Sequence, residues 1–171
     1  ILFPEKYSRY LDVPQNFSPE VGGRFYRSEL KQICDDLERL GGHKITDEAL
    51  RESISVFNEN RQHIQDLYQA RSKEPWRFPT WEVYLIVRAG YLLSVEAHNA
   101  MLSDYLKLAR DRDAKELDNI RVVVKGSFCE QPPLELLRTI ERAGCYIVND
   151  DLLLGTRWIE DEIDTDGDPL D

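Results

Sequence analysis

The chain has 171 residues, with 22 basic against 32 acidic side chains, so its formal net charge is −10. This length suits one domain, or one domain with an appended helical segment, and a hydrophobic content of 42% is enough to bury a core. Binding to nucleic acid or to an anionic membrane surface needs clustered Lys and Arg, which so acidic a chain does not favour. No apolar run approaches the roughly 18 residues of a membrane-spanning helix. We therefore expect neither nucleic acid nor a membrane among its partners.

Cysteine usage bears on the cellular compartment. Cys34, Cys129 and Cys145 form neither a CxxC pair nor a short-spaced zinc pattern. An odd, sparse set of thiols without a recognisable signal peptide predicts the reducing cytoplasm. Because Ile1 stands where a start Met is expected and the chain stops at Asp171 after an acidic run, we also expect a piece of a longer protein.

The first segment, residues 1–23, is predicted to be a strand and a loop that enter the domain. Lys6–Val13 alternates enough to form a strand, and Pro14 ends it because proline cannot donate to a ladder. Residues 15–23 are predicted to be loop.

Residues 24–118 are predicted to be mainly helical. Apolar residues recur every three or four positions over Arg24–Leu40, and Gly41-Gly42 supplies the stop. A second helix begins after Thr46, a suitable N-cap, and continues with a similar apolar face to near Arg71. These two helices are therefore expected to form an antiparallel hairpin.

Two shorter helices are predicted after a connector at residues 74–79, where each proline disfavours helical angles for the residue before it. Thr80 is expected to cap the third helix, which Gly90 weakens. The fourth helix starts near Ser94 and ends in a charged tail, residues 110–118.

The hydrophobic period then changes, which predicts a βαβ unit over residues 119–151. Ile120–Val124 is a short β-branched run typical of a buried parallel strand, and Cys145–Val148 is a second strand. Between them Pro132-Pro133 opens a helix that stops at Gly144. The two strands should be parallel, with a right-handed crossover.

The fold class that follows is α/β, with a helical hairpin region followed by a βαβ unit of a parallel, Rossmann-like sheet. Residues 152–171 add a short helical turn and an acidic tail. Because two strands do not complete a parallel sheet, we expect a fragment of a larger subunit.

The turn after the Ile120 strand is the strongest candidate site. Ligands of open α/β sheets bind outside the carboxyl ends of the strands. Ser127, Cys129 and Glu130 are expected at the N-terminus of the next helix, whose dipole stabilises an anion and lowers the pKa of a thiol. They would then act as a reactive thiol, a metal ligand or a substrate-facing carboxylate. The alternative, which residue types alone favour, is that Ser127 or Glu130 caps the helix and Cys129 fills a small space.

Two acidic clusters invite interpretation as metal sites. Asn149-Asp150-Asp151 ends the second strand, where paired carboxylates can hold a metal or a ribose hydroxyl, but an N-cap with a polar first turn is the commoner role. Asp164–Asp168 is superficially similar to a calcium loop. It lacks the alternating oxygen ligands and the closing glutamate, so a solvated acidic turn is expected.

Other residues that could carry chemistry have ordinary explanations. No GxxxxGK[ST] or GxGxxG motif is present, so no nucleotide is expected on a Gly-rich loop. Cys34 and Cys145 are expected to behave as small hydrophobes. The histidines have no partner at ligand spacing and are expected at surface or capping positions: His43, His63 and His98. The aromatics around the connector either wall a pocket or, more commonly, join helix pairs as a hydrophobic hub: Trp76, Phe78, Trp81 and Tyr84.

One octapeptide is more specific than these patterns. Gly126 to Pro133 reads GSFCEQPP. Together with Gly144 to Val148 and Asp150-Asp151, it resembles the central region of the gamma (C) subunits of ATP-dependent benzoyl-CoA reductases. These belong to a larger group that includes the 2-hydroxyacyl-CoA dehydratases. Weaker matches extend the resemblance across nearly the whole chain: Tyr10 to Asn16, Lys44 to Asp47, Tyr84 with Arg88 to Gly90, and Gly167 to Leu170.

The resemblance implies an oxidoreductase of anaerobic aromatic degradation. Enzymes of this kind are oxygen-sensitive heterotetramers in which two subunits hydrolyse ATP and deliver low-potential electrons. The other two carry [4Fe–4S] clusters, bind benzoyl-CoA and reduce its ring to a cyclohexadiene-carbonyl-CoA. This chain resembles the second pair, so the expected partners are the other benzoyl-CoA reductase subunits and benzoyl-CoA.

The resemblance also implies that most cluster thiolates lie outside residues 1–171. We therefore expect a [4Fe–4S] cluster in the complete subunit, and no cofactor, metal ligand or activity in this fragment alone. In the complete enzyme Ser127, Phe128 and Cys129 are expected to line the substrate as donor, apolar wall and weak donor. Glu130 is discordant: pointing inward it would be protonated and donate a proton to the ring, and pointing outward it would be a helix-start carboxylate.

Two other functions remain open. The chain could belong to a 2-hydroxyacyl-CoA dehydratase subunit, which uses an electron to eliminate water. It could also be a non-catalytic assembly module whose helices only dock partner chains.

Overall fold

The computed structural model describes residues 6–126, 131–152, 155–159 and 161–170. It divides into two compact units, residues 1–53 with 164–171, and residues 54–163. None of the helices in the described ranges is long and apolar enough to cross a membrane. The division of the chain into segments 1–23, 24–118, 119–151 and 152–171 stays a prediction.

The first unit contains a short π-helix, η1 (Pro19–Gly23), and α1 (Arg24–Gly41). The stop of α1 is confirmed, since Gly42 takes a left-handed φ of 70° and its N–H bonds the Glu38 carbonyl. The Thr46 cap is also confirmed, because its hydroxyl accepts from the Ala49 N–H at 3.2 Å. Local chemistry therefore sets both ends of the link between α1 and α2 (Asp47–Lys73).

The predicted strand over residues 6–13 is wrong. These residues have no regular structure, and no described strand lies beside them to complete a ladder. Instead the Tyr7 hydroxyl donates to Asp36 on α1 at 3.0 Å, and Arg9 bonds the same carboxylate at 3.1 Å. Alternation of residue types without a pairing partner does not make a strand.

The antiparallel hairpin of α1 and α2 stays a prediction, because α1 and most of α2 belong to different units. No residue of α1 is buried, and Leu37 and Leu40 in its apolar stripe are 46% and 58% exposed. The acidic turn near the end of the chain is confirmed within the same unit as α1. It is anchored as well as solvated, since Asp168 pairs with Arg27 and the Gly167 carbonyl accepts from Arg51 at 3.1 Å.

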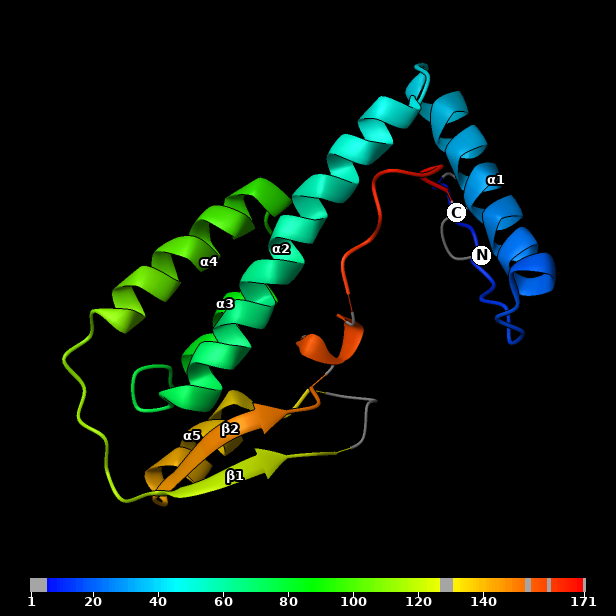
Figure 1. The fold of residues 1–171 in the computed structure, drawn as a ribbon. Helices are drawn as coiled ribbons and strands as arrows, with labels where there is room; N and C mark the ends of the chain where they lie inside the picture. The colour runs from blue at the N-terminus through cyan, green and yellow to red at the C-terminus, as the bar shows by residue number, and fades with distance from the viewer. Residues whose placement is uncertain (1–5, 127–130, 153–154, 160, 171) are drawn as a thin grey trace. The chain divides into compact units, whose positions relative to one another are not determined.

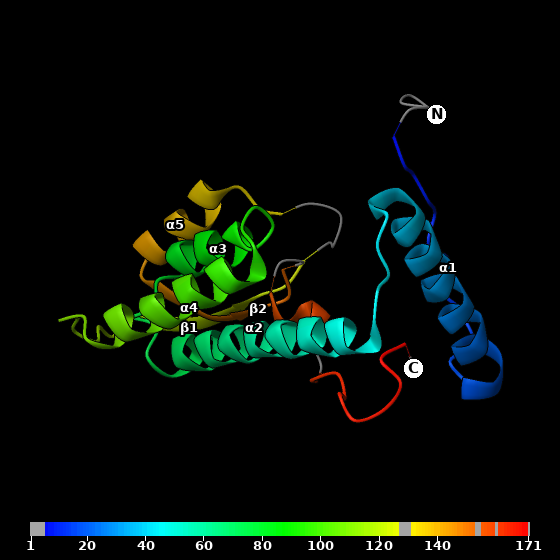
Figure 2. The same cartoon turned by 90° about the horizontal axis from the view of Figure 1, so that it is seen from above.

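The second unit has a helical layer of α2, α3 (Thr80–Ala89) and α4 (Val95–Arg110). Figures 1 and 2 show α3 between α4 and another helix of this unit, α5 (Leu134–Arg142). The Ser94 cap of α4 is confirmed by the bond from the Ala97 N–H. One apolar core joins these helices and the connector before α3: Ile64, Leu67, Phe78, Val83, Val87, Leu102, Leu106 and Ala109.

The βαβ unit is confirmed as β1 (Ile120–Val124), α5 (Leu134–Arg142) and β2 (Cys145–Asp150), and a 3₁₀ turn, η2 (Thr156–Trp158), follows. The two strands are parallel. Leu137 and Ile147, both fully buried, form one core cluster with Tyr84 of α3, and this cluster joins the sheet to the helices. Helix α5 begins at Leu134 rather than at the two prolines, and Pro133 occupies the capping position before it.

The expectation that β1 is buried is wrong. Its first residue, Ile120, is 70% exposed and Val123 is 53% exposed. Among the described residues β1 pairs with β2 alone, so it is the outer strand of a two-stranded sheet (Figure 1). The β-branched composition suits a strand that is covered on both faces, but among the described residues of β1 only Val122 and Val124 pack against the core.

His98 is buried, against the expectation of a surface or capping position, and is only 3% exposed. Its Nε2 lies 3.0 Å from the Ile86 carbonyl and its Nδ1 lies 2.9 Å from the Asn60 amide nitrogen. A neutral ring with its proton on Nε2 satisfies both neighbours, since Nδ1 can then accept from Asn60. Burial, with a smaller contribution from His63, lowers the pKa of His98 below its ordinary value.

Stability is therefore expected to depend on pH through His98. The unfolded chain binds this proton more readily than the folded one, so stability should be constant above about pH 6.5 and fall by up to about 1.4 kcal/mol per pH unit below it. Urea unfolding between pH 5 and 8 measures this, with H98Q flattening the slope and H43Q, at an exposed histidine, keeping it. An identical slope in H98Q would assign the effect to other groups.

Candidate functional site

The loop predicted to hold the site joins the carboxyl end of β1 to the start of α5. Strand β1 ends at Val124 and α5 begins at Leu134, so this stretch does connect strand to helix. The four predicted site residues lie outside the described residues: Ser127, Phe128, Cys129 and Glu130. Their roles stay predictions, and the described structure gives the groups that hold the flanks of the loop.

Asp151, directly after β2, forms hydrogen bonds with the backbone at and just after the end of β1. Its backbone N–H donates to the Val124 carbonyl at 3.2 Å, and its Oδ1 accepts from the Gly126 N–H at 3.1 Å. The preferred interpretation of Asn149-Asp150-Asp151 as a helix N-cap is wrong, because no helix starts there in the described residues. The side chain of Asp151 instead accepts the backbone N–H of Gly126, at the start of the loop between β1 and α5.

Asp150 forms the most deeply buried ion pair of the described residues, with Arg71 of α2. The Arg71 Nη1 lies 2.7 Å from the Asp150 Oδ2, and both side chains are 1% exposed. The other Asp150 oxygen accepts from the Tyr68 hydroxyl and the Leu152 N–H, both at 3.2 Å. Burial and the Asp150 charge raise the pKa of Tyr68 well above its usual range, so this hydroxyl stays protonated and donates.

This network decides what Asp150 can do. Its Oδ1 accepts two hydrogen bonds, and its Oδ2 has the ion pair with Arg71 but no hydrogen bond from the described residues. Because Arg71 already supplies a cation and the side chain is 1% exposed, Asp150 is poorly suited to a metal or a ribose. The candidate residues predicted from the sequence do not include Arg71. The sequence does contain a sign of its role. Arg71 falls on the apolar face of α2, at helical spacing from Ile64 and Leu67, and a charge on a buried face needs a buried partner.

Gly155 makes a close approach to the same network. A Cβ placed on Gly155 would lie 1.8 Å from the Tyr68 hydroxyl oxygen. We expect Gly155→Ala to destabilise a protein carrying this segment by about 1–3 kcal/mol through overpacking. Urea denaturation measures this, with Gly167→Ala as the matched control because nothing lies within 4 Å of its Cβ position. Equal midpoints for the two variants would contradict the contact.

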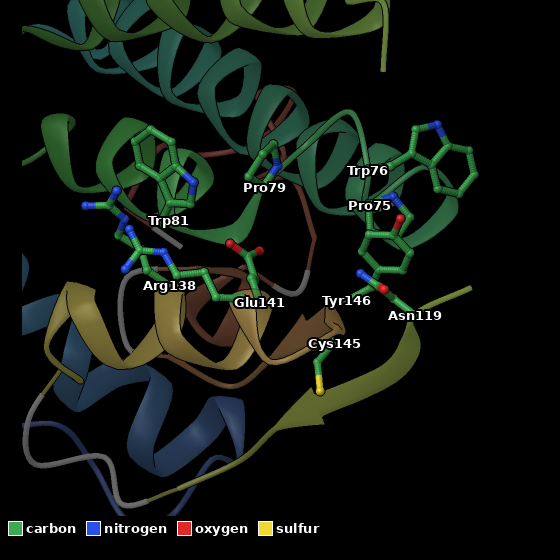
Figure 3. A pocket seen from close by; sticks show the side chains of 10 residues that line it. Pro75, Trp76, Pro79, Trp81, Asn119, Arg138, Glu141, Cys145 and Tyr146 are labelled. Carbon is green, nitrogen blue, oxygen red and sulfur yellow. The ribbon is translucent and has the colours of Figure 1, made fainter. Parts of the chain in front are cut away.

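A hollow of about 310 Å³ lies at the opposite, amino end of β2, near Cys145 (Figure 3). Trp76, Trp81 and Tyr146 contribute its aromatic walls. Of the four aromatic residues around the connector, the two that do not line this pocket belong to the core: Phe78 is fully buried and Tyr84 is 6% exposed. Both alternatives for the connector aromatics are thus realised, two of the four lining a pocket and two serving as a hub.

The polar groups of this hollow mainly serve the fold. Glu141 of α5 accepts the Thr80 N–H at 2.6 Å and so caps α3, while the Thr80 hydroxyl donates to the Ile147 carbonyl at 3.1 Å. The expected capping by Thr80 is therefore wrong; α5 supplies the cap. Burial raises the pKa of Glu141, opposed by the hydrogen bonds from Thr80. Arg138 stacks 5.4 Å from the Trp81 ring.

The described residues do not fit an iron–sulfur cluster. Cys34 and Cys145, both half-buried, belong to different units, and no group of three or more His, Cys, Asp or Glu that could hold a metal occurs in the described ranges. A [4Fe–4S] cluster needs about four converging thiolates. Burial raises the pKa of Cys34, which also opposes the thiolate form.

Comparison with known proteins decides the family. The family model for the 2-hydroxyglutaryl-CoA dehydratase D-component matches residues 2–171. The chain belongs to this family. The C subunit of benzoyl-CoA reductase from Thauera aromatica is 54% identical to it over 99% of the chain and 44% of that protein.

More distant relatives of the chain are dehydratase subunits. The lactoyl-CoA dehydratase beta subunit of Anaerotignum propionicum is 29% identical over 92% of the chain and 42% of that protein. The (R)-phenyllactyl-CoA dehydratase beta subunit of Clostridium sporogenes is 27% identical over 82% of the chain and 37% of that protein. The chain thus spans about two fifths of the length of these relatives, and the resemblance stated from the octapeptide is confirmed.

Proposed function

We propose that this chain is part of a benzoyl-CoA reductase subunit, which binds benzoyl-CoA and reduces its aromatic ring to a cyclohexadiene-carbonyl-CoA. One observation carries the proposal: identity to the C subunit of a benzoyl-CoA reductase is 54%, against 29% or less for the dehydratase subunits named above. The fragment by itself is proposed to be inactive.

The complete subunit is proposed to work in the cytoplasm in a heterotetramer, with electrons delivered by ATP-hydrolysing partner subunits. A [4Fe–4S] cluster is proposed for the complete subunit, with its thiolates outside this segment. When bound, such a cluster would supply single electrons at low potential. None of the described residues is assigned as its ligand.

The loop between β1 and α5 is proposed to line the substrate. Adding an electron to a benzoyl thioester builds negative charge on the carbonyl oxygen and the ring, which donors in an apolar setting stabilise. Ser127 and Cys129 are proposed as donors, Phe128 as an apolar wall and Glu130 as a protonated acid. The hydrogen bonds of Asp151 to Val124 and Gly126 support a loop whose start is held in place.

A subunit of a 2-hydroxyacyl-CoA dehydratase is the second candidate, favoured by the family to which the chain belongs. The purified complex, supplied anaerobically with ATP and a reductant, should be assayed with benzoyl-CoA and with a 2-hydroxyacyl-CoA. Ring reduction supports the first proposal and elimination of water the second. Full activity after the 126–131 loop is rewritten would instead favour a non-catalytic assembly module.

The isolated segment is expected to bind no iron–sulfur cluster, because Cys34 lies on α1, Cys145 lies on β2, and Cys129 is predicted to lie in the loop after β1. Anaerobic reconstitution followed by iron and sulfide analysis measures this. Near-stoichiometric [4Fe–4S] that disappears in C129S would show that Cys129 is a cluster ligand and that the proposal of ligands outside this segment is wrong.

A further inference from the structure

The 3₁₀ turn η2 places an arginine beside the loop between β1 and α5. Arg157 of η2 is exposed, and its Nη1 lies 3.5 Å from the backbone carbonyl of Asp151. Asp151 also accepts the Gly126 N–H with its side chain at 3.1 Å and donates its own N–H to the Val124 carbonyl at 3.2 Å. The guanidinium of Arg157 and the start of the loop therefore contact one and the same residue.

The backbone that carries Arg157 is anchored from helix α2. The Leu152 N–H donates to the Asp150 Oδ1 at 3.2 Å, and the same oxygen accepts from the Tyr68 hydroxyl of α2. Gly155, directly before η2, donates its N–H to the Leu152 carbonyl at 3.1 Å and packs against the Tyr68 hydroxyl too closely to carry a Cβ. The point from which the Arg157 side chain extends is therefore fixed relative to the end of β2, as a preorganised charge requires.

The charges at this edge of the sheet favour an anion. The described stretches 124–126, 150–152 and 155–159 carry two cations and two carboxylates: Lys125, Arg157, Asp150 and Asp151. The Asp150 charge is balanced by the buried Arg71. Two cations thus stand against a single remaining carboxylate, in a chain whose net charge is −10.

A permanent cation suits the charge that the proposed reaction builds. One electron delivered by the partner subunits would add one negative charge to the benzoyl thioester, shared between its carbonyl oxygen and its ring, and no bond breaks at this step. The donors proposed in the loop, Ser127 and Cys129, are neutral, whereas a hydrogen bond from a charged donor is about twice as strong. A guanidinium also keeps its charge at every relevant pH, so Arg157 needs no proton uptake to act.

We propose that Arg157 is a further catalytic residue, whose guanidinium donates to the thioester carbonyl oxygen as that oxygen gains negative charge. This inference rests on the proposed reaction and on a substrate that lies against the loop after β1. It assigns a role to η2, which lies outside the loop residues predicted from the sequence. Because the carbonyl is neutral before the electron arrives, Arg157 contributes more to turnover than to binding of the substrate.

Substitution of Arg157 in the complete complex tests this role. R157Q is expected to lower kcat with benzoyl-CoA by about 10²–10³-fold, the usual effect of losing one donor to a developing oxyanion. The Kd for benzoyl-CoA, measured without reductant, should stay close to that of the unmodified complex. R157K keeps a charge without the planar fork and should recover part of the rate. R142Q, at another exposed arginine, on α5, is the matched control and should turn over normally.

Chemical rescue separates this role from a structural one. Millimolar guanidinium should restore turnover to R157A, whose unfolding midpoint should match that of the unmodified complex. Normal kcat in R157Q would overturn the proposal. Weaker binding of both benzoyl-CoA and free CoA at unchanged kcat would also overturn it, because Arg157 would then contact a phosphate. A fall in kcat that follows a fall in the unfolding midpoint and is not rescued would make Arg157 structural.

The unmodified complex distinguishes failure of this inference from failure of the proposed function. If it reduces benzoyl-CoA and R157Q does so equally well, the reductase assignment stands and only the role of Arg157 is wrong. If the unmodified complex does not reduce benzoyl-CoA, the proposed function is wrong and this inference is wrong with it.

Discussion

Replacing Arg71 by methionine is expected to lower the free energy of unfolding of the complete subunit by about 3–5 kcal/mol. The substitution leaves the Asp150 carboxylate with no cation, and this side chain is only 1% exposed. It also removes the guanidinium that lies 4.4 Å from the centre of the Tyr68 ring. Urea denaturation followed by circular dichroism gives the change in midpoint.

Two further variants separate lost charge pairing from lost packing. The double variant R71M/D150N removes both charges and keeps a side-chain acceptor for Tyr68, so it should recover most of the stability. The exposed pair of Arg142 and Glu135 provides the matched control, since R142M should cost about 1 kcal/mol or less. Equal losses of unfolding free energy in R71M and R142M would show that the buried Arg71–Asp150 pair contributes no more to stability than an exposed pair.

Replacing Glu130 by glutamine in the complete complex is expected to reduce turnover with benzoyl-CoA by about 10²–10⁴-fold, with little change in KM. The proposal makes Glu130 a proton donor to the reduced ring, and glutamine cannot donate a proton in that way. Anaerobic steady-state assays give kcat and KM separately.

The matched control is E135Q, since Glu135 lies on the exposed first turn of α5 and pairs with Arg142 at 2.9 Å. Its kinetics should match those of the unmodified complex. If E130Q also turns over normally, Glu130 is a carboxylate at the helix start and has no part in proton transfer. That outcome would leave the assignment to the reductase standing, because the assignment rests on the sequence comparison.

Much of the candidate site follows from local sequence. The β-branched run of β1 and the two prolines before α5 predicted a strand-to-helix connection, and the structure confirms its ends at Val124 and Leu134. The family also followed from a short segment, since the octapeptide from Gly126 to Pro133 predicted the match that the whole chain then gave. The side-chain positions of residues 127–130 stay predictions.

The groups that support the site could not be predicted in the same way. Asp150 was expected to cap a helix, yet its hydrogen bond with Tyr68 spans 82 positions in the sequence. Thr80 was expected to cap α3, yet the cap comes from Glu141, 61 positions away. The residue types showed that these positions needed polar partners and gave no sign of which partners they would find.

The sequence by itself determined the helix and strands of the βαβ unit, their order, and three helix caps: Gly42, Thr46 and Ser94. Those features depend on hydrophobic period and on hydrogen bonds within a few residues, which the chain carries locally. The tertiary structure alone decided that Arg71 pairs with Asp150, that His98 is buried and neutral, and that residues 6–13 form no strand. Each of these depends on which distant segment supplies a partner and excludes water, and no local pattern encodes that choice.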